Sequence, residues 1–245
     1  MSAAVTAVEL GAARARVTVP AEPSGAGVLL YPTIMGVNSF IDGVAAELAA
    51  QGLTVVAWDP YRGEPRSDDL MTMVVRSKSV EDEDAIADLG RIADHMHDDL
   101  GVERLAGIGW CFGGRIGLLH GGLDQRLQVF CSYNPTMLSP IPFEVEGVGT
   151  TSKADMPGQT MDEFELARGL AGPVQVTRPE KDFTQAAEYE ALVAALFTRS
   201  APTFYEYYPG VDHGFSYIPG EANQRAQRYA WRSTLALLAD LRDQA

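Results

Sequence analysis

The chain has 245 residues, of which 46% are hydrophobic and 21% charged, and this length and apolar content fit one α/β domain with a large core. A formal net charge of −14 would repel nucleic-acid phosphates and anionic lipid, so neither nucleic acid nor a membrane is expected as a partner. Two cysteines cannot build a disulfide framework, and no secretory signal or membrane-spanning stretch is recognised, so we expect a cytoplasmic protein.

The first part of the chain alternates short apolar runs with helical patterns, which is typical of a parallel sheet covered by helices. Residues 27–31 are predicted to form a buried strand, and Asn38 is placed to cap a helix that stops at Gly52. A second strand is predicted at 53–58. The polar, Arg-rich stretch 61–78 has no clear period and is predicted to be a loop with a short helix.

Ser79 is predicted to cap the next helix, which opens with the acidic run 81–84. Carboxylates at a helix start favour the positive end of the helix dipole, so we expect this run to be a solvated surface. His95 and His97 lie two residues apart on the same helix and point to different faces, which argues against a shared metal ion. The sequence predicts neither a metal nor a cofactor.

The remaining elements continue the same alternation up to a long C-terminal helix. Between two of them, residues 138–171 carry Pro, Gly and acidic residues with little period, and a loop of that length is uncommon unless it covers something. We therefore predict a single domain, 1–245, with a lid-like insertion at 138–171. Strands are predicted at 104–109, 127–133, 172–177 and 203–208, and helices at 115–120, 185–199 and 221–242.

The segment GIGWCFGG at 107–114 has the form G-x-C-x-G between a predicted strand and a predicted helix. Such a nucleophile elbow needs glycines where backbones approach closely, here Gly109 and Gly113. It places Cys111 at a helix N-terminus, where the partial positive charge favours the thiolate. The alternative is a buried structural cysteine beside packing glycines, which is what we expect of Cys131 on its apolar strand.

Two later segments supply an acid and a base. Asp182 follows the strand at 172–177, and His213 lies in the loop after the aromatic strand at 203–208. With Cys111 they give the chain order nucleophile, acid, histidine of α/β-hydrolases, and all three come after parallel strands, where such sheets build their sites. Asp212 is the competing acid, but a residue adjacent to the histidine would rarely fold back onto its ring.

These residues resemble the dienelactone hydrolase family of α/β-hydrolases. The resemblance covers about residues 28–245 and rests on GWCFGG at 109–114, PEKD ending at Asp182, YPGVDHGF at 208–215 and MGVN at 35–38. It implies an α/β-hydrolase fold, with a mostly parallel central sheet flanked by helices on both faces.

The resemblance also implies a role for each candidate residue. Cys111 would be the nucleophile, His213 the base and Asp182 the acid that orients it, while the backbone N–H groups of Ile34 and Phe112 would form the oxyanion hole. The implied enzyme is a cysteine-dependent hydrolase of carboxylic esters or lactones that works through a thioester intermediate.

Two positions depart from the family pattern in a way that affects the substrate. Thr33 stands where the family has a Glu beside the thiol, and Tyr217 stands where it has an Arg for a substrate carboxylate. Arg76 is either a solvated surface residue or a replacement for that cation. An aromatic rim suited to a neutral acyl group or ring is expected from Trp110, Phe112, Tyr133, Phe215 and Tyr217, although Tyr133 at the end of its strand also fits simple sheet packing.

Three functions remain open at this level. The first is the hydrolase of a small-molecule ester or lactone, and the second is a biosynthetic cyclase or acyl transferase that uses the same triad, because a fold and a triad do not fix the acceptor. The third is a binding protein without catalysis, against which the intact Cys, Asp and His argue. The sequence is compatible with a monomer or a homodimer.

Overall fold

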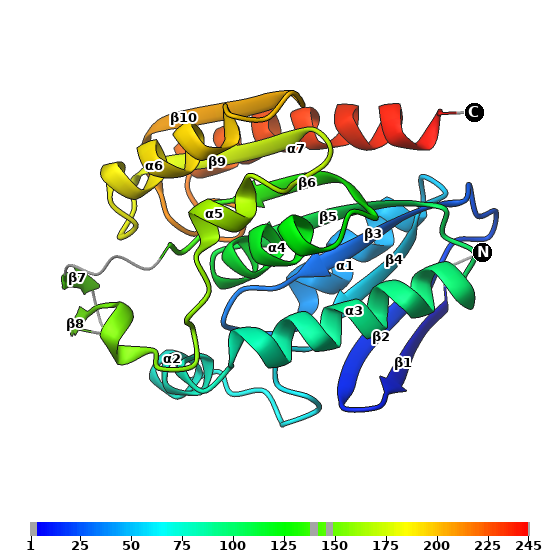
Figure 1. Ribbon diagram of the computed structural model, residues 1–245, viewed down its shortest axis with the longest axis horizontal. Helices are drawn as coiled ribbons and strands as arrows, with labels where there is room; N and C mark the ends of the chain where they lie inside the picture. Colours follow the sequence, from blue (N-terminus) through cyan, green and yellow to red (C-terminus); the bar gives the residue numbers. More distant parts are fainter. Residues whose placement is uncertain (1–3, 138–141, 146–148, 245) are drawn as a thin grey trace.

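A computed structural model of the chain describes residues 4–137, 142–145 and 149–244 (Figure 1). Within these residues, an eight-stranded sheet forms the centre of the molecule. Six neighbouring strands of this sheet are mutually parallel, and an N-terminal hairpin extends it antiparallel at one edge. In spatial order the strands are β1 (Ala4–Leu10), β2 (Ala13–Val19), β4 (Thr54–Trp58), β3 (Ala26–Tyr31), β5 (Arg104–Trp110), β6 (Leu127–Tyr133), β9 (Val174–Lys181) and β10 (Thr203–Asp212).

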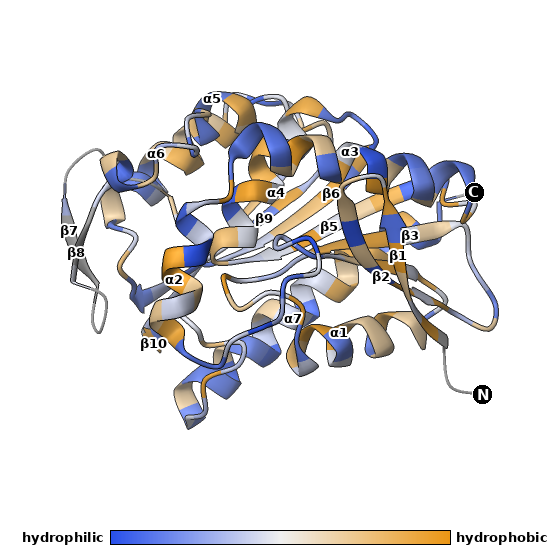
Figure 2. Ribbon diagram, turned by 90° about the horizontal axis from the view of Figure 1, so that it is seen from below, coloured by the Kyte–Doolittle hydropathy of each residue, from blue (hydrophilic) through white to orange (hydrophobic). Residues whose placement is uncertain are grey.

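Helices cover both faces of the sheet (Figure 2). Every residue of β3 and β4 is buried, which explains why these strands read as continuous apolar runs without alternation. One hydrophobic core packs α3, α4 and α6 against the sheet, and a second packs α1 and α7 against its other face. The helices are α1 (Ser39–Ala49), α2 (Leu70–Lys78), α3 (Asp82–Asp98), α4 (Phe112–Leu123), α5 (Glu163–Ala167), α6 (Ala186–Leu196) and α7 (Glu221–Arg242). None of these described helices combines the length and hydrophobicity of a membrane crossing.

The predicted α/β-hydrolase fold is confirmed, and the predicted strands and helices match with shifted ends. Asn38 caps α1 by accepting hydrogen bonds from the amides of Phe40 and Ile41. The hairpin of β1 and β2 was not predicted, because its charged and apolar residues alternate without the buried run that marks the parallel strands.

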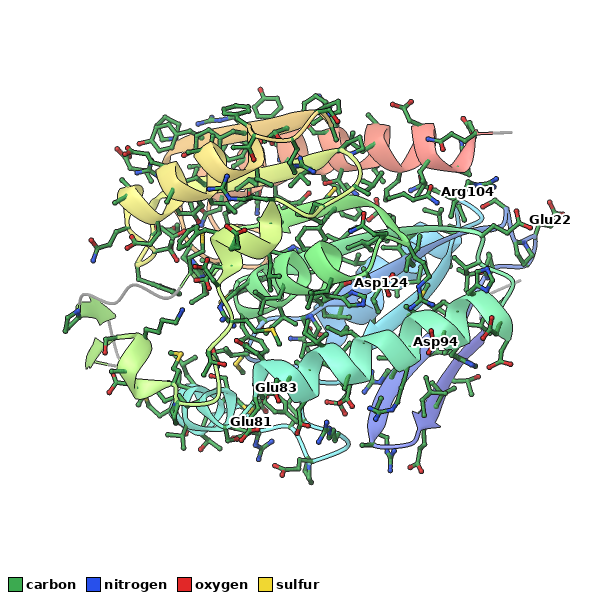
Figure 3. The ribbon with its side chains drawn as sticks, in the orientation of Figure 1. Glu22, Glu81, Glu83, Asp94, Arg104 and Asp124 are labelled. Carbon is green, nitrogen blue, oxygen red and sulfur yellow. The ribbon has the colours of Figure 1, made fainter. Side chains whose placement is uncertain are left out.

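The start of α3 differs from the prediction. Ser79 ends α2 instead of capping α3, and Glu81 is the residue before the first turn. Glu81 and Glu83 are exposed, as expected of an acidic helix start (Figure 3). Asp82, however, is completely buried, because the guanidinium of Arg115 in α4 donates two hydrogen bonds to its carboxylate, at 2.7 and 2.9 Å.

The predicted lid, 138–171, contains more structure than its sequence indicates, although 138–141 and 146–148 lie outside the described residues. Strands β7 (Phe143–Val145) and β8 (Gly149–Thr151) form a separate antiparallel pair. They lie at the end of the molecule that also holds α2 (Figure 1). A 3-10 turn, η1 (Lys153–Asp155), leads on to α5. Its last residue, Ala167, and the following Leu170 belong to the core that α3, α4 and α6 form with the sheet. The second half of the segment is therefore packed into the domain.

Candidate active site

Cys111 joins β5 to α4 in a sharp turn. Its backbone φ is +55°, in the left-handed region that non-glycine residues rarely occupy. A Cβ on Gly109 would lie 2.5 Å from the carbonyl oxygen of Gly113, and one on Gly113 would lie 2.1 Å from that of Tyr31. Only glycine fits at both positions. The turn places Cys111 directly before the first residue of α4, with its side chain 7% exposed.

Asp182 and His213 follow the ends of β9 and β10 and meet at the same edge of the sheet. The imidazole Nδ1 lies 2.8 Å from the Asp182 carboxylate, which is itself buried. That carboxylate also accepts hydrogen bonds from the Thr184 amide at 2.9 Å and the Tyr189 hydroxyl at 2.7 Å. Because both oxygens of Asp182 are hydrogen-bonded, the carboxylate has a fixed orientation and can hold the imidazole of His213 in one orientation.

Asp212 does not contact the histidine. Its carboxylate accepts a hydrogen bond from the Asn223 side chain at 2.8 Å and pairs with Lys181 at 3.4 Å. Of the two acids that the sequence offers, the structure therefore brings Asp182 to His213.

The charges of Cys111 and His213 favour an ion pair. Burial lowers the pKa of His213, but Asp182 and the Cys111 sulfur raise it by more, to about 10. Burial raises the pKa of the Cys111 thiol, but His213 and hydrogen bonds from Thr136 and the Phe112 amide lower it by more, so the net shift is downward. A thiol whose pKa falls beside an imidazole whose pKa rises has the electrostatics of an activated nucleophile.

The two candidate oxyanion donors lie on adjacent segments. The amide of Phe112 faces the Cys111 sulfur at the start of α4. Ile34 lies in a turn after β3 in which Thr33 accepts hydrogen bonds from Met35, at its hydroxyl, and from Gly36, at its carbonyl. The Thr33 hydroxyl is thus engaged by the backbone of its own turn.

Trp110 and Tyr133 do not belong to an aromatic rim. Both are fully buried in the core on the α1 and α7 side, where the Tyr133 ring packs between Trp110 and Phe215. The Tyr133 hydroxyl is hydrogen-bonded to Thr234 at 2.6 Å. Side chains at the end of a strand still alternate between the two faces of the sheet. The rings of Trp110 and Tyr133 lie on the face that α1 and α7 cover. The expected rim therefore loses Trp110, Tyr133 and Phe215.

Tyr217 remains beside the candidate site. Its ring packs against Phe40, and its side chain is partly exposed. Burial, Cys111 and Asp182 all raise the pKa of the phenol, so Tyr217 stays neutral next to the candidate triad. The ring of Phe183 stacks on His213 with centroids 4.1 Å apart.

Arg76 is linked to the turn that holds Ile34 through the ring of Tyr61. Its guanidinium lies over the ring of Tyr61, donates to the carbonyl of Pro65 at 2.7 Å and pairs with Glu64 at 3.2 Å. The Tyr61 hydroxyl in turn donates to the carbonyl of Ile34. Neither of the two expectations for Arg76 fits this arrangement fully, because the side chain is held by the protein and already has a carboxylate partner.

Two polar residues of the site were missed at the sequence level. The Asn134 side-chain nitrogen lies 3.2 Å from Nε2 of His213, and the Thr136 hydroxyl lies 3.1 Å from the Cys111 sulfur. Both follow directly on β6, the neighbour of β5 in the sheet. The sequence could have indicated them, because both residues come after a predicted strand that adjoins the elbow.

The chain is similar to known proteins over most of its length. The pattern of the dienelactone hydrolase family matches residues 13–241. A carboxymethylenebutenolidase of Rhodococcus opacus is 25% identical over 217 residues, which cover 86% of this chain and 80% of that relative.

Solved structures share the fold. The structure of a Klebsiella pneumoniae protein described as a dienelactone hydrolase matches with a TM-score of 0.78 and 20% identity, over 98% of this chain and 99% of the other. A dienelactone hydrolase-like promiscuous phosphotriesterase from metagenomic libraries matches with a TM-score of 0.74 and 18% identity, over 98% of both chains. Because the family pattern extends from β2 to the end of α7, the chain belongs to the dienelactone hydrolase family.

Proposed function

We propose that this hydrolase cleaves carboxylic esters or lactones with Cys111 as the nucleophile, His213 as the general base and acid, and Asp182 as the residue that orients His213. The observation that carries the proposal is the 2.8 Å hydrogen bond between His213 and a buried Asp182, beside a cysteine in a strained elbow. The downward pKa shift of the thiol supports the same assignment.

In the first step, the Cys111 sulfur attacks the substrate carbonyl carbon while its proton lies on Nε2 of His213. The carbonyl oxygen becomes an oxyanion, which the backbone N–H groups of Phe112 and Ile34 would stabilise. The C–O bond to the leaving group then breaks, and the departing alkoxide takes the proton from Nε2. An ester releases its alcohol, whereas the new hydroxyl of an opened lactone stays attached to the acyl group. In both cases a thioester on Cys111 remains.

In the second step, His213 removes a proton from water, and the water oxygen attacks the thioester carbonyl. The C–S bond breaks, the acid leaves, and the sulfur recovers its proton. Asp182 holds the imidazole with its proton on Nδ1 throughout. All of these steps use only groups of this chain and water. Because a reactive free thiol survives in a reducing compartment, we place the enzyme in the cytoplasm.

The proposed substrates are neutral. The name carboxymethylenebutenolidase describes a lactone that carries a carboxymethylene group, and a buried carboxylate needs a fixed cation, usually a bidentate Arg. In this chain Tyr217 and Thr33 occupy two family positions for charged side chains, and Arg76 is already paired with Glu64.

A panel of p-nitrophenyl esters and small lactones tests the proposal, with the Cys111→Ala variant beside the wild type. We expect turnover by the wild type, an acyl adduct on Cys111 in the quenched reaction detected by mass spectrometry, and no turnover by Cys111→Ala. Full activity of Cys111→Ala would contradict the assignment of the nucleophile.

A further inference from the structure

Asn134 contacts the reactive edge of His213. Its side-chain amide nitrogen lies 3.2 Å from Nε2, the same ring nitrogen that faces Cys111. Asp182 binds the opposite ring nitrogen, Nδ1. Once the leaving alkoxide has taken the proton from Nε2, the remaining proton of the ring lies on Nδ1 and faces Asp182. Nε2 then carries a lone pair, to which the amide of Asn134 can donate.

The conformation of Asn134 has the marks of a functional rather than a structural position. Its backbone φ is +38°, and its amide N–H is fixed by the carbonyl of Thr177 in β9. The side chain is fully buried, yet among the described residues its Oδ1 has no hydrogen-bond partner. An asparagine retained only for packing would have both ends of its amide satisfied, whereas here only the end that faces the histidine is.

We propose that Asn134 is a positioning residue that holds the imidazole of His213 in place once Cys111 has been acylated, so that it serves hydrolysis of the thioester rather than its formation. This inference rests on the proposed function of Cys111, Asp182 and His213.

The need for a second anchor arises from the chemistry of the sulfur. Before acylation, the Cys111 sulfur and His213 share a proton, and this attraction keeps Nε2 directed at the elbow. After the thioester has formed, the sulfur carries neither a proton nor a charge. Asp182 then holds the ring at Nδ1 and Phe183 stacks on its face, but neither of them holds Nε2. The Asn134 amide then remains as the protein contact at Nε2. At 3.2 Å this contact is at the long end of the usual range for an N–H hydrogen bond, so it is weak and the attacking water can displace it from the single lone pair of Nε2.

The same contact predicts a pH effect. A donor directed at the Nε2 lone pair favours the neutral imidazole, so removal of the Asn134 side chain raises the pKa of His213 in the acyl-enzyme. The acid limb of the kcat–pH profile then moves to higher pH. The substitutions at Asn134 leave the other titratable residues around His213 in place. These residues are Asp182, Cys111, Tyr61, Tyr189 and Tyr217.

Two substitutions remove the donor and keep the backbone. Asn134→Gly adopts the positive φ without strain, and Asn134→Asp keeps the size of the side chain and tolerates this conformation, but has no N–H. Asn223→Ala is the matched control, because Asn223 supports Asp212 next to the histidine without touching the ring. Stopped-flow measurement with p-nitrophenyl acetate separates acylation, seen as the burst of p-nitrophenolate, from deacylation, seen as the steady state.

We expect both Asn134 variants to slow deacylation about tenfold, the rate equivalent of one ordinary hydrogen bond, and to change acylation by less than about twofold. The acetyl adduct on Cys111 should accumulate, and the acid limb of kcat should move up, further for Asn134→Asp than for Asn134→Gly. If Asn134→Gly fails to fold, Asn134→Asp decides the question. In Asn223→Ala, looser packing of the loop should slow both steps by the same factor.

Equal slowing of acylation and deacylation in the Asn134 variants, or no change in either, would overturn this inference. Absence of any acetyl adduct on Cys111 in the wild type is a separate result, because it would overturn the proposed function itself. The two failures are therefore distinguishable in one set of experiments.

Discussion

Cys111 and Cys131 are both almost fully buried, and their surroundings shift the two thiols in opposite directions. Cys131 lies inside β6, where burial raises its pKa to about 12. Cys111 is buried to a similar extent, but His213 and the hydrogen bonds at the elbow shift its pKa downward. Burial alone therefore does not decide the reactivity of a thiol; the neighbouring imidazole does.

This contrast predicts selective alkylation. Iodoacetamide reacts with the thiolate, so its rate with Cys111 should rise with pH through a pKa below the usual cysteine range, while Cys131 stays protonated and unlabelled at neutral pH. Peptide mapping after limited labelling measures both sites. The Cys131→Ala variant is the control and should label at the wild-type rate. Faster labelling of Cys131 than of Cys111, with activity retained, would refute the choice of nucleophile.

The two candidate acids give a second test at single residues. Asp182→Asn should lower kcat by about 10⁴, because an amide favours the wrong tautomer of His213. Asp212→Asn keeps a hydrogen-bonding side chain beside Asn223 and should change kcat little, since Asp212 binds Lys181 and Asn223 and not the histidine. Steady-state kinetics on the two variants decides between them, and the reverse ranking would make Asp212 the acid.

At the scale of elements, a buried ion cluster fixes the elbow helix. Arg115 in α4 binds Asp82 at the start of α3 and lies 3.4 Å from Glu163 in α5, and all three side chains are almost fully buried. The amide of Met161 also donates to Asp82 at 2.9 Å. Three segments that are distant in the sequence thus meet on one guanidinium, and the second half of 138–171 is anchored to the helix that follows Cys111.

Removal of the guanidinium should therefore destabilise the fold strongly. Arg115→Met leaves two buried carboxylates without their cation, and we expect the free energy of unfolding to fall by roughly 3–5 kcal/mol. Urea denaturation followed by circular dichroism measures the loss. Arg66→Met is the matched control, because Arg66 and its partner Asp68 are both well exposed, and it should cost about 0–1 kcal/mol. Equal stability of the two variants would show that the cluster contributes nothing specific.

The other half of the predicted lid gives a separate prediction. Among the described residues, strands β7 and β8 pair with each other and with no other strand, and α2 lies at the same end of the molecule (Figure 1). Replacement of residues 142–151 by a short Gly-Ser linker should change KM and the range of accepted esters more than the melting temperature, because two strands that are separate from the central sheet contribute little to its folding. A variant that loses stability but keeps its substrate profile would exclude a role as a lid.

At the scale of the whole molecule, the sequence predicted what depends on local pattern and missed what depends on the tertiary arrangement. The α/β fold and the segments of Cys111, Asp182 and His213 follow from apolar runs, glycines and strand ends, which are local signals. Asn134 was missed because its role requires a positive φ and a neighbour from a distant loop. Tyr133 was misplaced because residues at a strand end can face either side of a sheet.

The net charge of the molecule bears on its substrate. The chain has a formal charge of −14, Tyr217 at the candidate site is neutral, and the candidate cation Arg76 is paired with Glu64. The electrostatic field of a negatively charged protein disfavours the approach of anions. Salt weakens this repulsion, since the Debye length shortens from about 30 Å at 0.01 M to about 10 Å at 0.1 M ionic strength.

Neutral esters and lactones should therefore have a higher kcat/KM than carboxylate-bearing lactones of similar size. Raising the ionic strength should increase kcat/KM for the anionic substrates and leave it nearly unchanged for the neutral ones, because salt screens only the repulsion of a charged ligand. Arg76→Met provides the control, and it should leave the preference for neutral substrates in place. A carboxylate-bearing lactone as the best substrate, with a sharply higher KM in Arg76→Met, would instead identify Arg76 as the cation that binds the substrate carboxylate.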